Sequence, residues 1–187
     1  MARENRHRLT EPEAVRALAH PVRLELLIHL MSTGPATASE CARAVGDSPS
    51  NCSYHLRVLA KHGLVESEDS DDGRERPWRA RVTGITSPGS EAAPGTPAAT
   101  DAAALLAVSV QRDQRLLLDY LARRDAVDER WRGVDMYNSY TLRVTPEEMR
   151  ELGDRLDALI RPYIAAIRDD SPAGADLVHA NLTAFPR

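Results

Sequence analysis

Two short helices that follow each other within a few residues are the feature that most constrains the fold of this chain. Thr37 and Glu40 have the spacing of a capping box, which predicts the start of the first helix. Gly46 is placed to end that helix in the left-handed conformation. Ser48 then caps a second helix, expected over 49–62. The short gap between the two predicts a helix-turn-helix motif.

The segments on either side of this pair extend the pattern. Before it, Thr10 and Glu13 form another capping box, and Pro21 is expected in the first turn of the next helix. After it, apolar and polar residues alternate, which predicts strands at 64–68 and 78–82. Strong turn formers lie between these strands, so we expect a hairpin. A hairpin behind a helix-turn-helix is a wing.

The second half of the chain has a different composition. Small residues and proline dominate 84–100, which predicts a mobile linker. A helix is expected over 101–124, and alternating apolar residues predict a strand over 136–144. The capping box of Thr145 and Glu148 opens a further helix, expected over 146–168.

We therefore predict a mainly α fold (α+β) with a winged helix-turn-helix domain at its N-terminus. The domain boundaries are expected to be 10–83 for the winged helix-turn-helix, 84–100 for the linker, 101–170 for a mostly helical C-terminal region, and 171–187 for a loosely structured tail. Both predicted C-terminal helices have apolar faces broader than a lone surface helix needs. We expect these faces to be buried partly across a two-fold axis, which predicts a homodimer.

Composition and charge restrict the cellular setting. No apolar run approaches the ~20 residues of a membrane span, and the N-terminus lacks the hydrophobic core of a signal peptide. We therefore expect a cytoplasmic protein without a membrane partner. The net charge of −4 at first argues against a nucleic-acid partner. However, residues 1–83 carry equal numbers of basic and acidic residues, so the excess of acid lies in the second half.

The helix expected at 49–62 has two chemically distinct sides. Cys52, Leu56 and Leu59 recur at helical spacing and should face the core. Asparagine pairs with adenine, arginine pairs with guanine, and hydroxyls contact bases or phosphates. The other side therefore carries our candidate DNA-binding residues, which are Ser50, Asn51, Ser53, Tyr54 and Arg57. Free N–H groups behind the cap at Ser48 suit a phosphate, and Lys61 is expected to meet the DNA backbone. The alternative is a solvated polar face on a structural helix.

Two segments together resemble the ArsR-type winged-helix transcriptional regulators. They are ALAHPVRLELL, from Ala17 to Leu27, and SYHLRVLAKHGLV, from Ser53 to Val65. The resemblance covers about residues 10–83, which is less than half of the chain. It implies a dimeric repressor whose fourth helix enters the major groove while the wing flanks the DNA. On the wing, the implied minor-groove or backbone contacts are Arg74 and Arg76.

The chain departs from the metal-sensing members of that family. They carry a Cys-x-Cys pair in the short third helix, whereas this chain has Cys41 alone there. Nor are there Asp and His residues at metal-ligand spacing on the 101–124 helix, so we expect no metal and no cofactor. Cys41 and Cys52 could form a redox pair, but we favour two small buried hydrophobes. His20 and His29 are expected to be structural.

The C-terminal region offers one further candidate site. Trp131, Tyr137 and Tyr140 could line a pocket for a small-molecule effector, although a core without a ligand is an alternative of at least equal weight. The favoured function is a sequence-specific DNA-binding repressor that partners double-stranded DNA. Its main rival is a winged-helix module that binds proteins, which the acidic turn at 69–73 would favour. An enzyme is not expected, because no catalytic constellation is recognisable.

Overall fold

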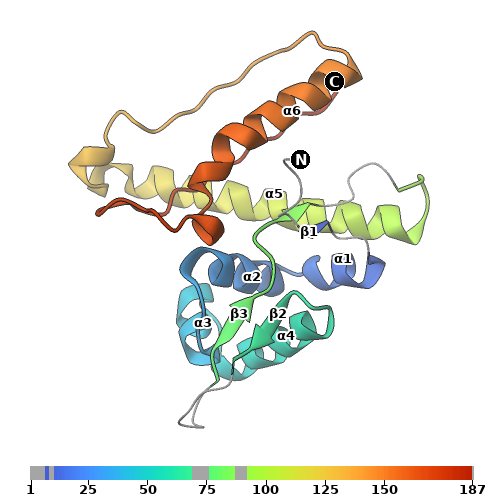
Figure 1. The fold of residues 1–187 in the computed structure, drawn as a ribbon, viewed down its shortest axis with the longest axis vertical. Coiled ribbons are helices and arrows are strands. Elements are labelled where there is room, and N and C mark those ends of the chain that lie inside the picture. The colour runs from blue at the N-terminus through green and yellow to red at the C-terminus, as the bar shows by residue number, and fades with distance from the viewer. Residues whose placement is uncertain (1–6, 9–10, 69–75, 87–91, 187) are drawn as a thin grey trace.

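The computed structural model describes residues 7–8, 11–68, 76–86 and 92–186 (Figure 1). Its α-helices are α1 (Pro12–Leu18), α2 (Pro21–Thr33), α3 (Ala38–Val45), α4 (Pro49–Lys61), α5 (Pro97–Arg123) and α6 (Pro146–Ile160). Its strands are β1 (His7–Arg8), β2 (Val65–Ser67), β3 (Trp78–Ala80) and β4 (Ile85–Thr86), and its short 3-10 turns are η2 (Arg124–Ala126), η3 (Glu129–Trp131), η4 (Arg161–Tyr163) and η5 (Ala165–Ile167). The predicted mainly α fold with an N-terminal helix-turn-helix is confirmed.

The caps predicted for α3 and α4 are present, whereas the one predicted for α1 is wrong. Thr37 and Glu40 form a reciprocal capping box, and Ser48 accepts a hydrogen bond at the start of α4. In α1 the cap is Glu11 rather than Thr10, and its side chain makes no capping hydrogen bond. Pro12 explains the difference, because a proline with its fixed φ favours the first helical position.

The core of the N-terminal domain is made of leucines and small residues from all four of its helices. Its fully buried side chains are Leu18, Leu24, Leu26, Leu27, Cys41, Cys52, Leu56, Leu59, Leu64 and Val65. Burying one leucine stabilises a fold by about 1.5–3 kcal/mol relative to leaving it exposed. Cys52, Leu56 and Leu59 face inward on α4 as predicted, together with His55, and the remaining polar side of that helix faces outward.

The predicted hairpin forms, although its strands are shorter than expected. β2 and β3 pair antiparallel, with Val65 opposite Ala80 and Ser67 opposite Trp78. The backbone of Trp78 also exchanges hydrogen bonds of 2.8 and 2.9 Å with Ala36, which fixes the hairpin against the start of α3. The predicted turn at 69–73 lies outside the described residues. β1 and β4 form a separate parallel pair.

Helix α5 lies across α1 and α2 (Figure 1). It begins at Pro97, four residues before the predicted start and inside the stretch expected to be a linker. Ala102 and Leu105 are buried. Asp101 accepts three hydrogen bonds from the guanidinium of Arg16 on α1, one of 2.9 Å and two of 3.2 Å. The beginning of α5 is therefore packed on the N-terminal domain.

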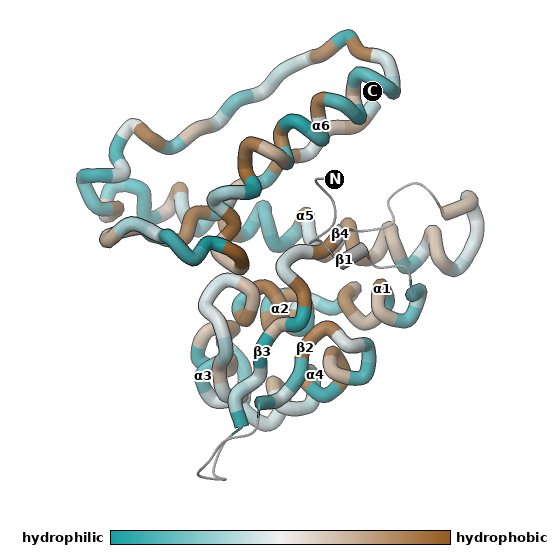
Figure 2. The backbone as a smooth tube through the Cα atoms, viewed as in Figure 1, coloured by the Kyte–Doolittle hydropathy of each residue, from teal (hydrophilic) through white to brown (hydrophobic). Residues whose placement is uncertain are grey.

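The predicted strand at 136–144 is wrong. This segment is extended but pairs with no described strand, and Met136 and Tyr140 are 86% and 76% exposed. Figure 2 shows hydrophobic residues separated by hydrophilic ones along it. Alternation distributes side chains between two faces, but a strand also requires a neighbour for its backbone hydrogen bonds.

The helix predicted over 146–168 ends early, at Ile160. Pro162 is the reason, because proline has no N–H to donate to the carbonyl four residues before it, although Arg161 itself still has a helical conformation. Two 3-10 turns follow, and the second, η5, packs on α2. The described tail is attached through Asp176, which accepts a hydrogen bond from Trp131 at 2.8 Å.

A search of the described helices for one both long and apolar enough to span a bilayer finds none.

The burial of Leu105 predicts a stability test of how α5 is docked. Leu105→Ala should lower the free energy of unfolding by about 2–5 kcal/mol, because it leaves a cavity between α5 and the N-terminal domain. Gln111→Ala, on an exposed position of the same helix, should change it by less than about 0.5 kcal/mol. Urea unfolding followed by circular dichroism measures both. Equal effects of the two substitutions would contradict the packing.

Candidate nucleic-acid interface

The geometry of the helix-turn-helix is set by the residues between α3 and α4. Gly46 has a φ of 72°, which glycine adopts without a steric penalty. Its N–H and that of Asp47 both donate to the carbonyl of Ala42, at 3.0 Å, and so close α3. Cys41 and Cys52 are fully buried where the two helices pack. This packing holds α4 with one side outward.

An open depression of about 570 Å³ lies on this outward side. Its walls come from the start of α3, from one side of α4 and from the hairpin. They consist of Ala38, Ser39, Pro49, Ser50, Ser53, Arg57, Ser67, Arg76 and Trp78. None of these residues is acidic. Hydroxyls and guanidinium groups on one concave face are the donors that contact phosphates and base edges.

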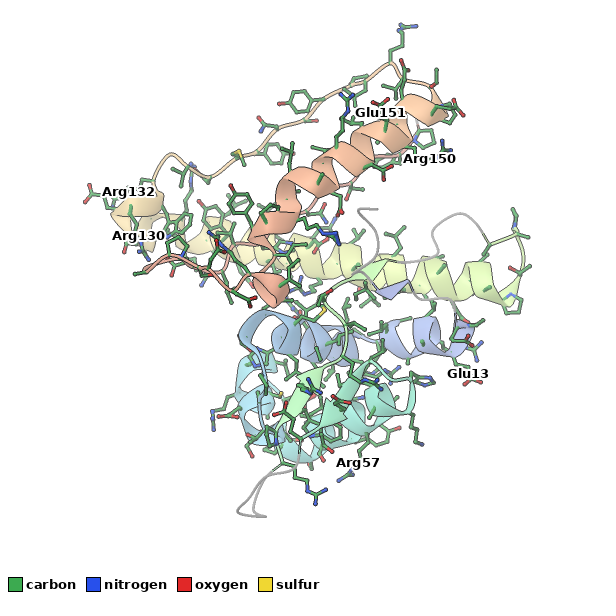
Figure 3. The ribbon with its side chains drawn as sticks, in the orientation of Figure 1. Glu13, Arg57, Arg130, Arg132, Arg150 and Glu151 are labelled. Carbon is green, nitrogen blue, oxygen red and sulfur yellow. The ribbon has the colours of Figure 1, made fainter. Side chains whose placement is uncertain are left out.

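Arg57 differs from the arginines of the hairpin strands. Arg79 pairs with Glu66 and with Glu68, and Arg81 lies 3.4 Å from Glu66, so both hairpin guanidiniums have carboxylate partners. Arg57 is exposed, and none of the acidic residues that the structure describes pairs with it. Within the described part of the chain, no carboxylate therefore neutralises its charge. Figure 3 shows Arg57 at the opposite end of the molecule from Arg150 on α6.

The structure brings together only some of the predicted DNA-binding residues. Ser50, Ser53, Arg57 and Arg76 line the depression. Tyr54 lies beside it, 58% exposed, with its ring edge against His55. Lys61 is exposed at the last position of α4, and Arg74 lies outside the described residues. The depression also contains Ser39, Ser67 and Trp78, which the sequence did not single out. Each is a lone residue on α3 or on a hairpin strand, and the pattern of these elements indicates secondary structure rather than binding.

Asn51 and Ser48 are not arranged as predicted. The amide nitrogen of Asn51 donates to Asp47 at 2.6 Å, so part of its hydrogen-bonding capacity is used inside the protein. The other oxygen of Asp47 accepts the N–H of Ser48, also at 2.6 Å. These two hydrogen bonds, the backbone one first, lower the pKa of Asp47. A carboxylate thus occupies the start of α4, where free N–H groups for a phosphate were expected.

The fully buried thiols have no disulfide between them. Burial, followed by the neighbouring Cys52, raises the pKa of Cys41 to about 11. Burial also raises the pKa of Cys52, with a smaller contribution from Asp47. Both shifts oppose the thiolate that redox chemistry needs, which favours the interpretation as small buried hydrophobes. Among the described residues, no group of three potential metal ligands occurs.

The three aromatic residues proposed for an effector pocket do not meet. Trp131 lines a second depression, of about 360 Å³, together with Tyr120, Arg124, Asp125, Val127, Arg132, Gly133 and Asp135. Tyr137 and Tyr140 are not part of its walls and are 86% and 76% exposed. They lie on the extended segment that lacks a partner strand, so the alternation that grouped them with Trp131 was misleading.

His55 is the functional candidate that sequence reasoning missed. It is only 5% exposed and contacts the ring of His20. The signal was its position three residues after Cys52 and four before Leu59, which places it on the buried side of α4.

The comparison with protein families agrees with this geometry. Residues 18–68 match the family model of a helix-turn-helix domain. This part of the chain is a helix-turn-helix domain. No curated protein matches the chain.

The buried thiols predict slow chemical modification. At pH 8 a thiol with a pKa of about 11 is ionised in about one molecule in a thousand, so Cys41 should react with a disulfide reagent far more slowly than a free thiol. In denaturant both cysteines should react at the ordinary rate. Absorbance of the released chromophore measures both rates. Rapid release of two equivalents from the native protein would contradict the assignment.

Proposed function

We propose that this protein is a dimeric transcriptional repressor of the ArsR type that reads DNA by inserting α4 into the major groove. The observation that carries the proposal is the concave face at Ser50, Ser53 and Arg57, which combines hydroxyls with an arginine that lacks an acidic partner among the described residues. Arg76 extends this face onto the hairpin, where a wing contacts the DNA backbone. The family match to a helix-turn-helix domain supports the same function.

The homodimer is supported by the distribution of exposed apolar side chains. Apart from Tyr54, every large apolar side chain found exposed among the described residues lies between Leu106 and Phe185. On α5 these include Leu117, Leu118 and Leu121, which follow one another at helical spacing. A second copy would cover this surface and would also place two α4 helices on one DNA duplex, as half-sites one helical turn apart require.

The depression beside Trp131 is the proposed effector site. Tyr120 and Trp131 supply aromatic rings, and Arg124 and Arg132 supply guanidinium groups. Asp125 and Asp135 also line this depression, and Asp135 pairs with Arg124 at 2.9 Å, so such walls suit a planar, polar small molecule. We also propose that the chain is divided into a DNA-binding domain, a connecting segment and a C-terminal dimerisation region. A cytoplasmic location is a further part of the proposal.

Arg57 provides the test of DNA binding. Arg57→Ala should weaken binding to the DNA upstream of the protein's own coding sequence by about 1–3 kcal/mol, because a guanidinium contact to a base or phosphate is lost. The matched control is Arg150→Ala on α6, which should leave affinity unchanged (Figure 3). Fluorescence anisotropy over a salt series measures both, and the wild-type affinity should fall steeply with salt. A salt-independent affinity that Arg57→Ala does not alter would favour the protein-interaction module instead.

Leu118 provides the test of the dimer. Leu118 is 64% exposed on α5, so Leu118→Glu should leave the monomer folded but place a charge in the proposed two-fold interface. Arg123→Glu introduces a carboxylate at an exposed position that is rotated by about 140° around α5 from Leu118, away from the three leucines, and should leave the dimer intact. Sedimentation velocity measures the mass of each. A monomeric wild type at micromolar concentration would contradict the dimer.

A further inference from the structure

Two imidazole rings meet behind α4, on the side away from the concave face. His20 precedes the first residue of α2, and His55 lies on the buried side of α4. Their ring centroids are 4.6 Å apart, with the planes inclined at 41°. The Nδ1 atoms of both rings are buried, and neither has a hydrogen-bond partner among the described residues. The pair therefore joins α2 to α4 without satisfying its own polar atoms.

Two charged groups and one neutral aromatic ring surround this pair. Arg23 of α2 lowers the pKa of both imidazoles, after the larger effect of burial, and its Nε donates to the carbonyl of Ala17 at the end of α1. Asp47, in the turn before α4, acts in the opposite direction. Its carboxylate, however, already accepts hydrogen bonds from Ser48 and Asn51. The ring of Tyr54 covers His55 from α4 itself, at 5.2 Å.

A proton bound to either ring would therefore create a cation in an unfavourable place. It would lie beside the guanidinium of Arg23 and, at His55, almost out of contact with water. A buried charge without a dedicated partner is strongly destabilising. Rotating or withdrawing α4 would return the ring to water, so protonation competes directly with the docking of α4 on α2.

We propose that the His20–His55 pair is an acid-sensitive joint that releases the DNA-reading helix α4 from α2 when it takes up a proton. The effect on DNA rests on the proposed function, whereas the loosening of α4 is a property of the fold alone. The only reactant is a solvent proton, which binds a ring nitrogen of the pair.

The direction of the pH effect follows from the lowered pKa values. The unfolded chain binds protons at the ordinary imidazole pKa of about 6.5, and the folded chain binds them only at lower pH. The stability that the neutral His20–His55 pair gives to the folded chain is therefore fully present above about pH 6.5. It is lost as the pH falls through the lowered pKa values of the two imidazoles in the folded chain. DNA affinity should fall in the same range. An imidazole that contacts a phosphate gives the opposite sign, because protonation strengthens that contact.

The experiment compares the full-length wild type with His55→Phe and His20→Gln between pH 7.5 and 5.0 at constant ionic strength. Phenylalanine keeps a ring against Tyr54 but cannot titrate. His62→Gln, at the end of α4, is the matched control, since it removes a histidine outside the pair. Thermal unfolding is followed by circular dichroism. Affinity is measured by anisotropy for a DNA fragment selected at pH 7.5.

We expect the wild type and His62→Gln to lose melting temperature and DNA affinity together below about pH 6.5. The affinity loss should be at most about tenfold per pH unit for each proton taken up. His55→Phe should flatten both profiles, and His20→Gln should flatten them in part. The proposal would be contradicted if both variants lost melting temperature and DNA affinity in acid as the wild type does. A DNA affinity that rises in acid would also contradict it.

One further measurement and one outcome of the binding experiment distinguish failure of this proposal from failure of the proposed function. Nuclear magnetic resonance titration of the wild-type imidazole Cε1 protons does not depend on how the variants fold, and values at or above 6.5 for both rings would overturn the proposal. Absence of DNA binding at pH 7.5 would contradict the proposed function. In that case the melting profiles of wild type and His55→Phe still decide whether the joint exists.

Discussion

The burial of one side of α4 is the interaction on which the rest of this molecule depends. Cys52, Leu56 and Leu59 are completely removed from solvent between α2 and α3. Because successive helical residues are separated by about 100°, fixing this side determines where every other side chain of α4 points. Ser50, Ser53 and Arg57 then face outward, toward the hairpin. The chemistry of the concave face is thus a geometrical consequence of apolar packing on its opposite side.

Local signals in the sequence predicted the N-terminal domain well. The caps at Thr37 and Ser48 and the glycine at 46 act through their immediate neighbours, so their spacing alone identifies them. The error at Thr10 has a local cause too, because Pro12 displaced the helix start by one residue. Pro162 was equally visible, and its effect on the end of α6 followed from its missing N–H.

What could not be predicted depends on contacts between distant or competing groups. The alternation over 136–144 describes two faces but contains no information about a neighbouring strand. Asn51 has the right residue type and position for reading a base, yet Asp47 competes for its amide through a hydrogen bond that no periodicity indicates. The partial grouping of the predicted site residues has the same origin. Residue type indicates which interactions are possible, whereas the local partners decide which are made.

The attachment of α5 has a consequence for how a signal could reach the DNA. Asp101 binds Arg16 of α1, and Arg112 lies 3.1 Å from Glu25 of α2. At 1.5 Å per residue these two anchors are about 16 Å apart along the helix axis. A helix held at two separated points resists pivoting about either one. This part of α5 should therefore rotate with the helix-turn-helix domain as a rigid body. Independent bending is left to the helical segment beyond Arg115 and to the 3-10 turn at Arg124–Ala126.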